Sequence, residues 1–395
     1  MNGRRAYLLF VFLLVLLVFG VGTKIVSAAE SPAETAESGE TKEVQEDSGE
    51  VLLAEFDFSE IEESLREMFP GEKITFQDVL DSMISGNPEE TGKLFLQFLT
   101  DQIFYEFNYN RRNFVYVILV ALTAAVFSNF AGAFRSRQIS DLSFYVMYML
   151  LITLCLTAFR TSAEGLEERL GSLVDFMRVL CPSYFLAVAF ASGSTTALFF
   201  YNVILFLIYT VELLIVRFLL PVVNVYIMVR VLGNLTGEDF LSELADLIRK
   251  AVTWILRSML ACVVGVNVVQ GLLAPAVDTI RRSALTRTAE ALPWVGNAIG
   301  GAAEVVVGTA VLIKNGIGMA GAVIAVVLCA VPVLQMLFTA LMYKLAAALV
   351  QPVSDKRITA CISGVSEGYE ILVHVIFTTG VLFLITIAMV AASTS

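Results

Sequence analysis

Apolar runs with few or no charged residues recur along the chain from about residue 113 onward. A helix rises about 1.5 Å per residue, so about 20 apolar residues are needed to cross a hydrocarbon core of about 30 Å. Runs of this kind predict eight transmembrane helices, at residues 114–133, 142–159, 197–216, 218–235, 251–274, 294–313, 316–343 and 371–392. The pattern therefore predicts an all-α protein in which residues 113–395 form a polytopic transmembrane domain.

Two segments of this domain fit the pattern less simply. Residues 160–178 mix acidic and basic side chains, which predicts an amphipathic segment outside the membrane. Residues 179–191 are apolar but short, contain Pro182, and precede a run of Ser, Gly and Thr. This favours a re-entrant or interfacial segment. The pattern leaves the span boundaries of residues 179–216 and 294–313 open.

Basic side chains mark three of the loops between predicted spans. They are Arg135 and Arg137 in the first loop, Arg281, Arg282 and Arg287 in the second, and Lys344, Lys356 and Arg357 in the third. Cytoplasmic loops carry an excess of Lys and Arg, so the pattern places all three loops in the cytoplasm. The segment before the first span and the C-terminus are then both predicted outside.

The first 112 residues have a different character. Arg4 and Arg5 precede an apolar run and a stretch of small side chains, which is typical of a secretory signal peptide over residues 1–29. An uncleaved first span is the alternative. Residues 30–55 are rich in Glu, Ser, Thr and Ala and predict a disordered acidic linker. Residues 56–112 predict a small extracytoplasmic domain of amphipathic helices.

Composition and charge support this division. Apolar residues make up 57% of the 395 residues and charged residues only 16%, too few to cover a water-facing surface of this length. The net charge of −11 comes from one block, since residues 30–110 carry 21 acidic and 4 basic side chains. Nucleic-acid binding needs clustered basic side chains, so the charge favours a lipid bilayer as partner and no nucleic acid.

The chain offers little for catalysis or cofactor binding. His374 is its only histidine, which excludes a two-histidine zinc motif. The five cysteines form no C-x-x-C pair, and no phosphate-binding loop of the form G-x-x-x-x-G-K-[ST] occurs. We therefore predict a non-enzymatic protein with no catalytic, cofactor-binding or metal-ligating residue.

Small side chains cluster in the last third of the chain. The glycines of this cluster are Gly296, Gly300, Gly301, Gly316, Gly318 and Gly321. Small residues let helix backbones approach closely in a membrane, so close helix packing is one hypothesis. A glycine-lined conduit or gating hinge is the other.

Several charged residues fall within predicted spans or at their ends. They are Glu212, Arg217, Arg230, Arg257, Glu304 and Lys314. Charges at membrane depth are costly, so each needs a partner or water. Arg217, Arg230 and Lys314 lie near span ends and can extend to the interface. Arg257 and Glu304 lie deeper. For these two the pattern leaves open an ion pair, a polar element of a pore, or a misplaced helix boundary.

Three motifs in the last third resemble one known family. They are PWVGNAIGG at residues 293–301, VLIKNGIG at 311–318 and QPVSDKR at 351–357. Together with the order of signal, acidic leader and polytopic body, they resemble the stage III sporulation protein AE family. The N-terminal 110 residues are similar to this family only in their general character and not in specific motifs.

The resemblance implies a role in endospore formation. Its members lie in the mother-cell-derived membrane around the forespore, in a channel or secretion-like complex that connects the two cells and supports late forespore development. The partners it implies are other stage III sporulation membrane proteins, including an ATPase and ring-forming subunits. A stand-alone secondary transporter or permease of unknown substrate remains the alternative.

Overall fold

A computed structural model of the chain describes residues 58–68, 75–77, 79–80, a few positions between 115 and 126, 137–192, 194–233, 241–289 and 296–393. The predicted signal peptide, the acidic linker, and most of both the extracytoplasmic domain and the first predicted span lie outside these residues.

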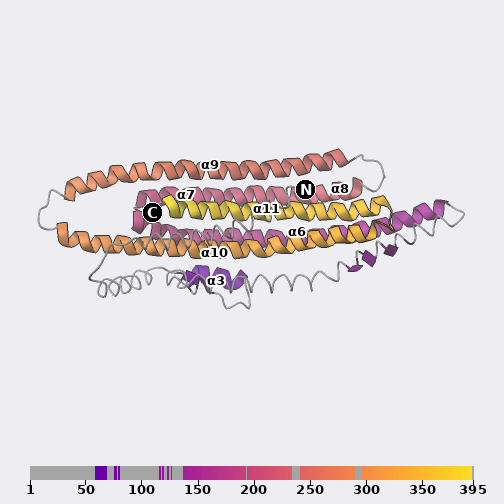
Figure 1. Cartoon of the computed structure of the whole chain (residues 1–395), viewed down its shortest axis with the longest axis horizontal. Helices are drawn as coiled ribbons and strands as arrows, with labels where there is room; N and C mark the ends of the chain where they lie inside the picture. Colours follow the sequence, from indigo (N-terminus) through magenta and orange to yellow (C-terminus); the bar gives the residue numbers. More distant parts are fainter. Residues whose placement is uncertain are drawn as a thin grey trace.

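The described residues form helices and no strand. The helices are α3 (Ser59–Met68), α6 (Arg137–Ser192), α7 (Ser194–Thr210), the π-helix η1 (Val211–Leu219), α8 (Leu220–Gly233), α9 (Ser242–Ala289), α10 (Gly296–Val350) and α11 (Lys356–Ser393). The long helices lie side by side along one axis, as Figure 1 shows. At 56 residues, α6 is about 84 Å long, well over twice the thickness of a hydrocarbon core.

Helix α6 joins segments that the sequence pattern separates. The predicted span at 142–159, the charged segment at 160–178 and the short apolar run at 179–191 are all parts of this one helix. The prediction of a re-entrant or interfacial segment at 179–191 is therefore wrong. Pro182 is accommodated inside the helix. The charges of 160–178 do not interrupt the helix because one face of the same turns is apolar and buried.

Other predicted boundaries also lie within continuous helices. Residues 294–313 and 316–343 fall in α10, which runs without a break for 55 residues. Among the described residues, four helical stretches are long and apolar enough to cross a membrane: Phe144–Ala191, Phe200–Gly233, Gly308–Val350 and Lys356–Ala388. Within the described part of the chain, the eight predicted spans are not confirmed.

The continuous helices also change the expected topology. Residues 281–287 lie near the end of α9, whereas residues 344–357 lie around the turn between α10 and α11. These two basic regions lie toward opposite ends of the bundle (Figure 1). Both were predicted to be cytoplasmic, which required two crossings between them. The single continuous helix α10 provides only one crossing.

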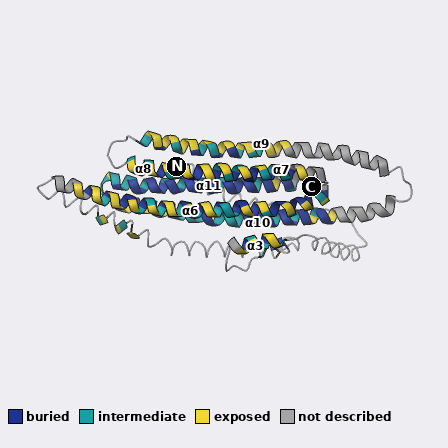
Figure 2. Ribbon diagram, turned by 180° about the vertical axis from the view of Figure 1, so that it is seen from behind, coloured by how far each residue is buried: buried dark blue, intermediate teal, exposed yellow. Residues whose placement is uncertain are grey.

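A hydrophobic core runs through the part of the bundle whose side chains are described, and α11 contributes many of its buried side chains (Figure 2). Tyr369 is a centre of this core. Its ring stacks on Tyr343 at 5.5 Å and meets Phe159 edge-on at 5.1 Å. Its hydroxyl lies 3.0 Å from the Ser162 hydroxyl and donates to the carbonyl of Ala158 at 3.3 Å. These contacts fix α6, α10 and α11 in one register.

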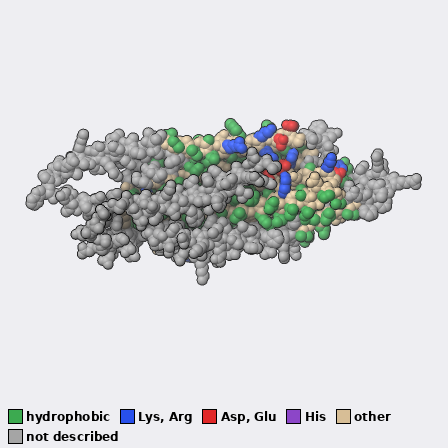
Figure 3. All heavy atoms as spheres, viewed as in Figure 1, with side chains coloured by type: hydrophobic (Ala, Val, Ile, Leu, Met, Phe, Trp, Pro, Cys, Tyr) green, Lys and Arg blue, Asp and Glu red, His purple; other side chains and the backbone are tan. Residues whose placement is uncertain are grey.

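Charged side chains are unevenly distributed on the surface. On the face drawn in Figure 3 they gather toward the end where α8 ends and α9 begins, while apolar side chains cover much of the described surface nearby. Exposed apolar residues include Trp254, Val269 and Phe206, which are 71%, 56% and 70% exposed. Such a surface suits contact with lipid rather than water.

Candidate functional site

Side-chain contacts establish which parts of the helices lie level with one another. Phe159 of α6 is level with Tyr369 of α11 and with Tyr343 of α10, as the aromatic contacts show. Farther along, a Cβ added to Gly321 of α10 would lie 2.5 Å from the side chain of Leu180 in α6. Residues 159–180 of α6 therefore run alongside residues 321–343 of α10, in the opposite direction.

Three helices are uncharged over the same depth. These stretches are residues 258–277 of α9, 316–337 of α10 and 375–393 of α11. The Tyr369 contacts place Val375, the start of the α11 stretch, about level with residue 165 of α6. Each stretch is about 20 residues long, or about 30 Å, which matches a hydrocarbon core. We call these three stretches together the uncharged belt.

Helix α6, in contrast, carries charged side chains at the depth of this belt and just beside it. Arg160, Glu164, Glu167, Glu168, Asp175 and Arg178 are all exposed and form what we call the charged stripe. Their spacing places them on one face of the helix, while Leu166, Leu170 and Leu173 on the other face are buried. Arg160 lies outside the belt, where it pairs with Glu164 at 2.8 Å.

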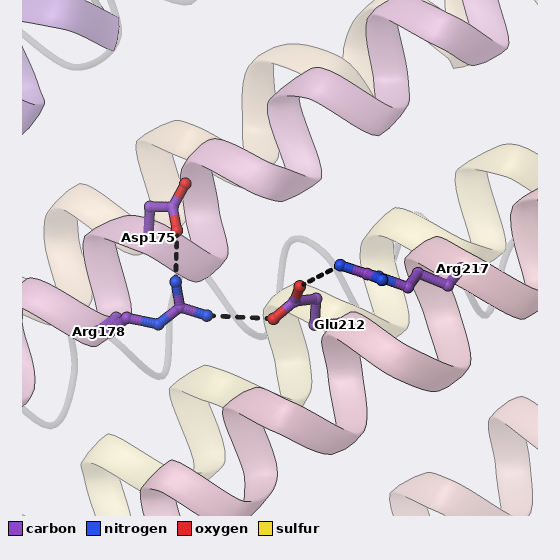
Figure 4. A network of polar contacts seen from close by, with 4 residues as sticks. All are labelled: Asp175, Arg178, Glu212 and Arg217. Carbon is purple, nitrogen blue, oxygen red and sulfur yellow. Dashed lines mark hydrogen bonds and ion pairs between the residues drawn. The ribbon is translucent and has the colours of Figure 1, made fainter.

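The part of the stripe that lies deepest in the belt, Asp175 and Arg178, forms a network of ion pairs with η1. Arg178 Nη1 donates to Asp175 Oδ1 at 3.1 Å, and its Nη2 donates to Glu212 Oε2 at 3.1 Å. Arg217 Nη2 donates to the other oxygen of Glu212 at 3.2 Å. Figure 4 shows these four residues, which we call the central network, linking α6 to η1.

The central network lies near the middle of the belt and faces outward. Asp175, Arg178, Glu212 and Arg217 have side chains that are 62%, 52%, 32% and 71% exposed. Two carboxylates balance two guanidinium groups, so its net charge is zero. Partly satisfied charges at this depth cannot face hydrocarbon without a cost of a few kcal/mol, so the network needs protein or water over it.

The π-helix explains how two charges of η1 reach α6. Hydrogen bonds from i to i+5 widen the turn and change the angle between successive side chains, and such segments are frequent at functional sites. Glu212 and Arg217 are five residues apart, close to one π-turn, so they lie on the same side of η1. The buried residues Val211, Ile215 and Leu219 hold the opposite side against the bundle.

The predicted glycines fall at different places. Gly318 and Gly321 face α6, where an added Cβ would lie 3.1 Å from the Tyr184 ring and 2.5 Å from Leu180. Gly316 is buried in the same helix. Gly296, Gly300 and Gly301 begin α10, but their side-chain surroundings are outside the described residues. Whether the whole cluster serves packing or a conduit stays a prediction.

The expected partner of the two deep charges of the sequence pattern lies outside what the described side chains show. Arg257 is exposed on α9, one residue before the uncharged belt begins. Glu304 lies in α10, 17 residues before Gly321 and thus about 26 Å from it along the axis. The side chain of Glu304 is not described, so its partner stays a prediction.

Arg230, one of the charges that the sequence pattern identified, belongs to a second charged cluster around Glu367 of α11, which the pattern did not single out. Glu367 Oε2 accepts a hydrogen bond from Tyr226 at 3.2 Å and pairs with Arg230 at 3.3 Å and Arg249 at 4.0 Å. It thus links α8, α9 and α11 beside the belt. Residues 356–370 mix charges with apolar side chains at helical spacing, which was the available signal.

Comparison with known proteins agrees with this membrane architecture. The family model of stage III sporulation protein AE matches residues 74–394. A curated relative, "Stage III sporulation protein AE" of Bacillus subtilis (strain 168), is 25% identical over 386 residues, with 96% of each chain covered. No solved structure matches the chain. Because the family model covers most of the sequence, the chain belongs to the stage III sporulation protein AE family.

Proposed function

We propose that this chain is a non-enzymatic membrane subunit of a channel or secretion-like complex that connects mother cell and forespore. Membership of a stage III sporulation family supports a sporulation role. In this proposal the protein is a multi-pass component of the mother-cell-derived membrane around the forespore. An ATPase and ring-forming subunits supply energy and continuity, and late forespore development depends on the assembly.

The outward-facing central network is the observation that carries the proposal. A stand-alone transporter places the charges of its transport path inside its own bundle. Here four charged side chains near the middle of the belt lie on the outer surface of the chain. Such a surface suits a subunit whose membrane face is completed by an assembly. It favours the complex over the alternative, a secondary transporter or permease that works alone.

The experiment replaces the chromosomal gene in the spore-forming host with variants that neutralise the network. Arg178→Gln removes the arginine that joins Asp175 to Glu212. We expect completed engulfment, reduced expression of a late forespore reporter and a fall in heat-resistant spores, with the protein still present in the membrane. Arg160→Gln is the matched control, because Arg160 lies in the same helix outside the belt. Its spore yield should be near that of the wild type.

Two results would contradict the proposal. One is a normal spore yield for Arg178→Gln at a normal protein level. The other is a failure to recover an ATPase or ring-forming protein when the tagged chain is isolated from sporulating cells by mild solubilisation. Solute uptake by liposomes that contain only this chain would instead support the transporter.

A further inference from the structure

The central network has unused capacity for ion pairs. Arg217 has five N–H donors and, among the described residues, one ion pair, with Glu212. Asp175 likewise has one, with Arg178. Both side chains project from the surface, at 71% and 62% exposed. The network thus presents a spare donor and a spare acceptor at its two ends (Figure 4).

We propose that a second copy of this chain packs on the surface formed by the central network of α6 and η1, with Arg217 of each copy pairing with Asp175 of the other. Two copies inserted in the same direction are related by a two-fold axis along the membrane normal. That operation keeps every residue at its own depth, and residue i meets residue j while j meets i. The surface must therefore be complementary to itself at each depth.

The central network meets this requirement. It holds two carboxylates and two guanidinium groups, so both signs are available at one depth. Through its bond to Glu212, which is itself bonded to Arg178, the Arg217 guanidinium lies within about one helical turn of the Asp175 level. Two reciprocal Arg217–Asp175 pairs would satisfy both spare groups and remove the network from lipid.

Charge complementarity separates this occupant from others. A strongly basic or acidic partner would leave half of a neutral network opposite like charges. Lipid chains would leave all four charged groups without additional partners. A second copy supplies two positive and two negative groups, in the arrangement that the first copy needs. The inference rests on the proposed function in one respect, because it names a second copy as the partner that completes the network's face. A cross-linking failure would remove this partner without removing the sporulation role, which the spore yield of Arg178→Gln tests separately.

Gly171 gives the approach room. It lies on α6 between Glu168 and Asp175, on the side of the charged stripe, and a Cβ added there would meet no atom within 4 Å. The absence of a side chain lets a second backbone come close to α6 beside the central network. The same open space makes the position suitable for an engineered cysteine.

The first experiment is disulfide cross-linking in native membranes of a full-length chain whose five cysteines have been replaced. Gly171→Cys is oxidised with copper-phenanthroline, and the product is separated without reductant. We expect a disulfide-linked species of twice the monomer mass, which reductant converts back to the monomer. Gly265→Cys is the matched control. It is also a helical glycine with nothing within 4 Å, it lies at a similar depth in the belt, and it belongs to α9. It should remain monomeric.

The second experiment reverses the paired charges in differently tagged copies, each with Gly171→Cys. Asp175→Arg in one copy places Arg opposite Arg217 of an identical partner, and Arg217→Asp places Asp opposite Asp175. Each variant alone should lose cross-linking by at least about tenfold, the change expected for 1.4 kcal/mol. Expressed together, the two variants should form mixed dimers at near the original yield. In a mixed dimer, the unchanged Arg217 of one copy faces the unchanged Asp175 of the other. The two introduced charges, Arg at position 175 and Asp at position 217, face each other as well.

Defined outcomes would overturn the inference. The first is a monomeric Gly171→Cys chain, or a cross-link to a protein of different size. If Gly265→Cys cross-links as efficiently as Gly171→Cys, the cross-link reflects random collisions in the membrane. Variants that reach the membrane at wild-type levels but give no mixed dimers would rule out the Arg217–Asp175 pair. If a reversed variant fails to accumulate, Arg217→Gln replaces it, and an unchanged cross-linking yield would then count against the pair.

Discussion

Glycine positions inside the bundle mark where helices approach most closely. At Gly368 of α11, an added Cβ would lie 2.8 Å from Ile227 Cδ1 and 2.9 Å from Phe159 Cε2. Phe159 is 1% exposed and held by Tyr369, so its ring has little room to move. Close contact between α6, α8 and α11 therefore depends on the absence of a side chain at this position.

Gly368→Ala should destabilise the protein. Overpacking costs about 1–3 kcal/mol, and the better helix propensity of Ala recovers up to about 1 kcal/mol of it. We expect a lower midpoint of thermal unfolding for the detergent-solubilised chain. Gly308→Ala is the control, because a Cβ there meets nothing within 4 Å, and its midpoint should be unchanged or higher. A Gly368→Ala midpoint equal to or above that of Gly308→Ala would contradict the close approach.

At the same scale, the sequence predicts that charges in spans need partners but not which partners. Glu212 and Arg217 were identified as such charges, and they do form ion pairs. Asp175 and Arg178 were predicted in an amphipathic segment outside the membrane, because the order of charges along the chain does not give their level relative to α10 and α11. Only the contacts of residues 159 and 180 with α10 and α11 reveal their depth.

At the scale of the elements, η1 sets the register between α7 and α8. Its nine residues form a wide π-turn between two α-helices, and nothing in their apolar pattern distinguishes them from an ordinary helix. Helical character could therefore be predicted from the sequence, while the π-turn could not. The helix ends were missed for a related reason. Hydrophobic windows of about 20 residues divide long helices that have no backbone break.

Removing one residue from η1 should disconnect the central network. Deletion of Leu213, which is 49% exposed, allows an ordinary α-helix. The lost residue and the tighter α-twist partly offset each other, so Glu212 turns by a fraction of a turn relative to α8, enough to move its carboxylate out of reach of Arg178. We expect a membrane protein of near-normal abundance that gives few heat-resistant spores. Leu213→Ala keeps the register and loses only an exposed side chain, so it should sporulate nearly normally. A functional deletion variant would show that the π-turn is dispensable.

At the scale of the whole molecule, the bundle is far longer than a bilayer is thick. Helix α10 alone extends about 82 Å, of which about 33 Å lies in the uncharged belt. We therefore expect the two ends of the bundle to stand in water on opposite sides of the membrane. Arg137, Lys250, Lys356 and Arg357 lie toward one end, and this excess of basic residues favours the cytoplasm for that end.

Cysteine labelling tests this arrangement in cells that express the chain without its native cysteines. Val353→Cys, in the exposed turn between α10 and α11, should react with a membrane-impermeant maleimide only after the cells are opened. Ser283→Cys, near the opposite end of α9, should react in intact cells. Val269→Cys is exposed in the middle of the belt and should react in neither case, because the reagent and the thiolate form both need water. The pattern of basic loops alone predicts protection of residue 283, since it places residues 281–287 and 344–357 on the same side. Labelling of residue 283 from outside would favour a single membrane crossing by α10. Protection of both residue 283 and residue 353 in intact cells would favour two crossings between them.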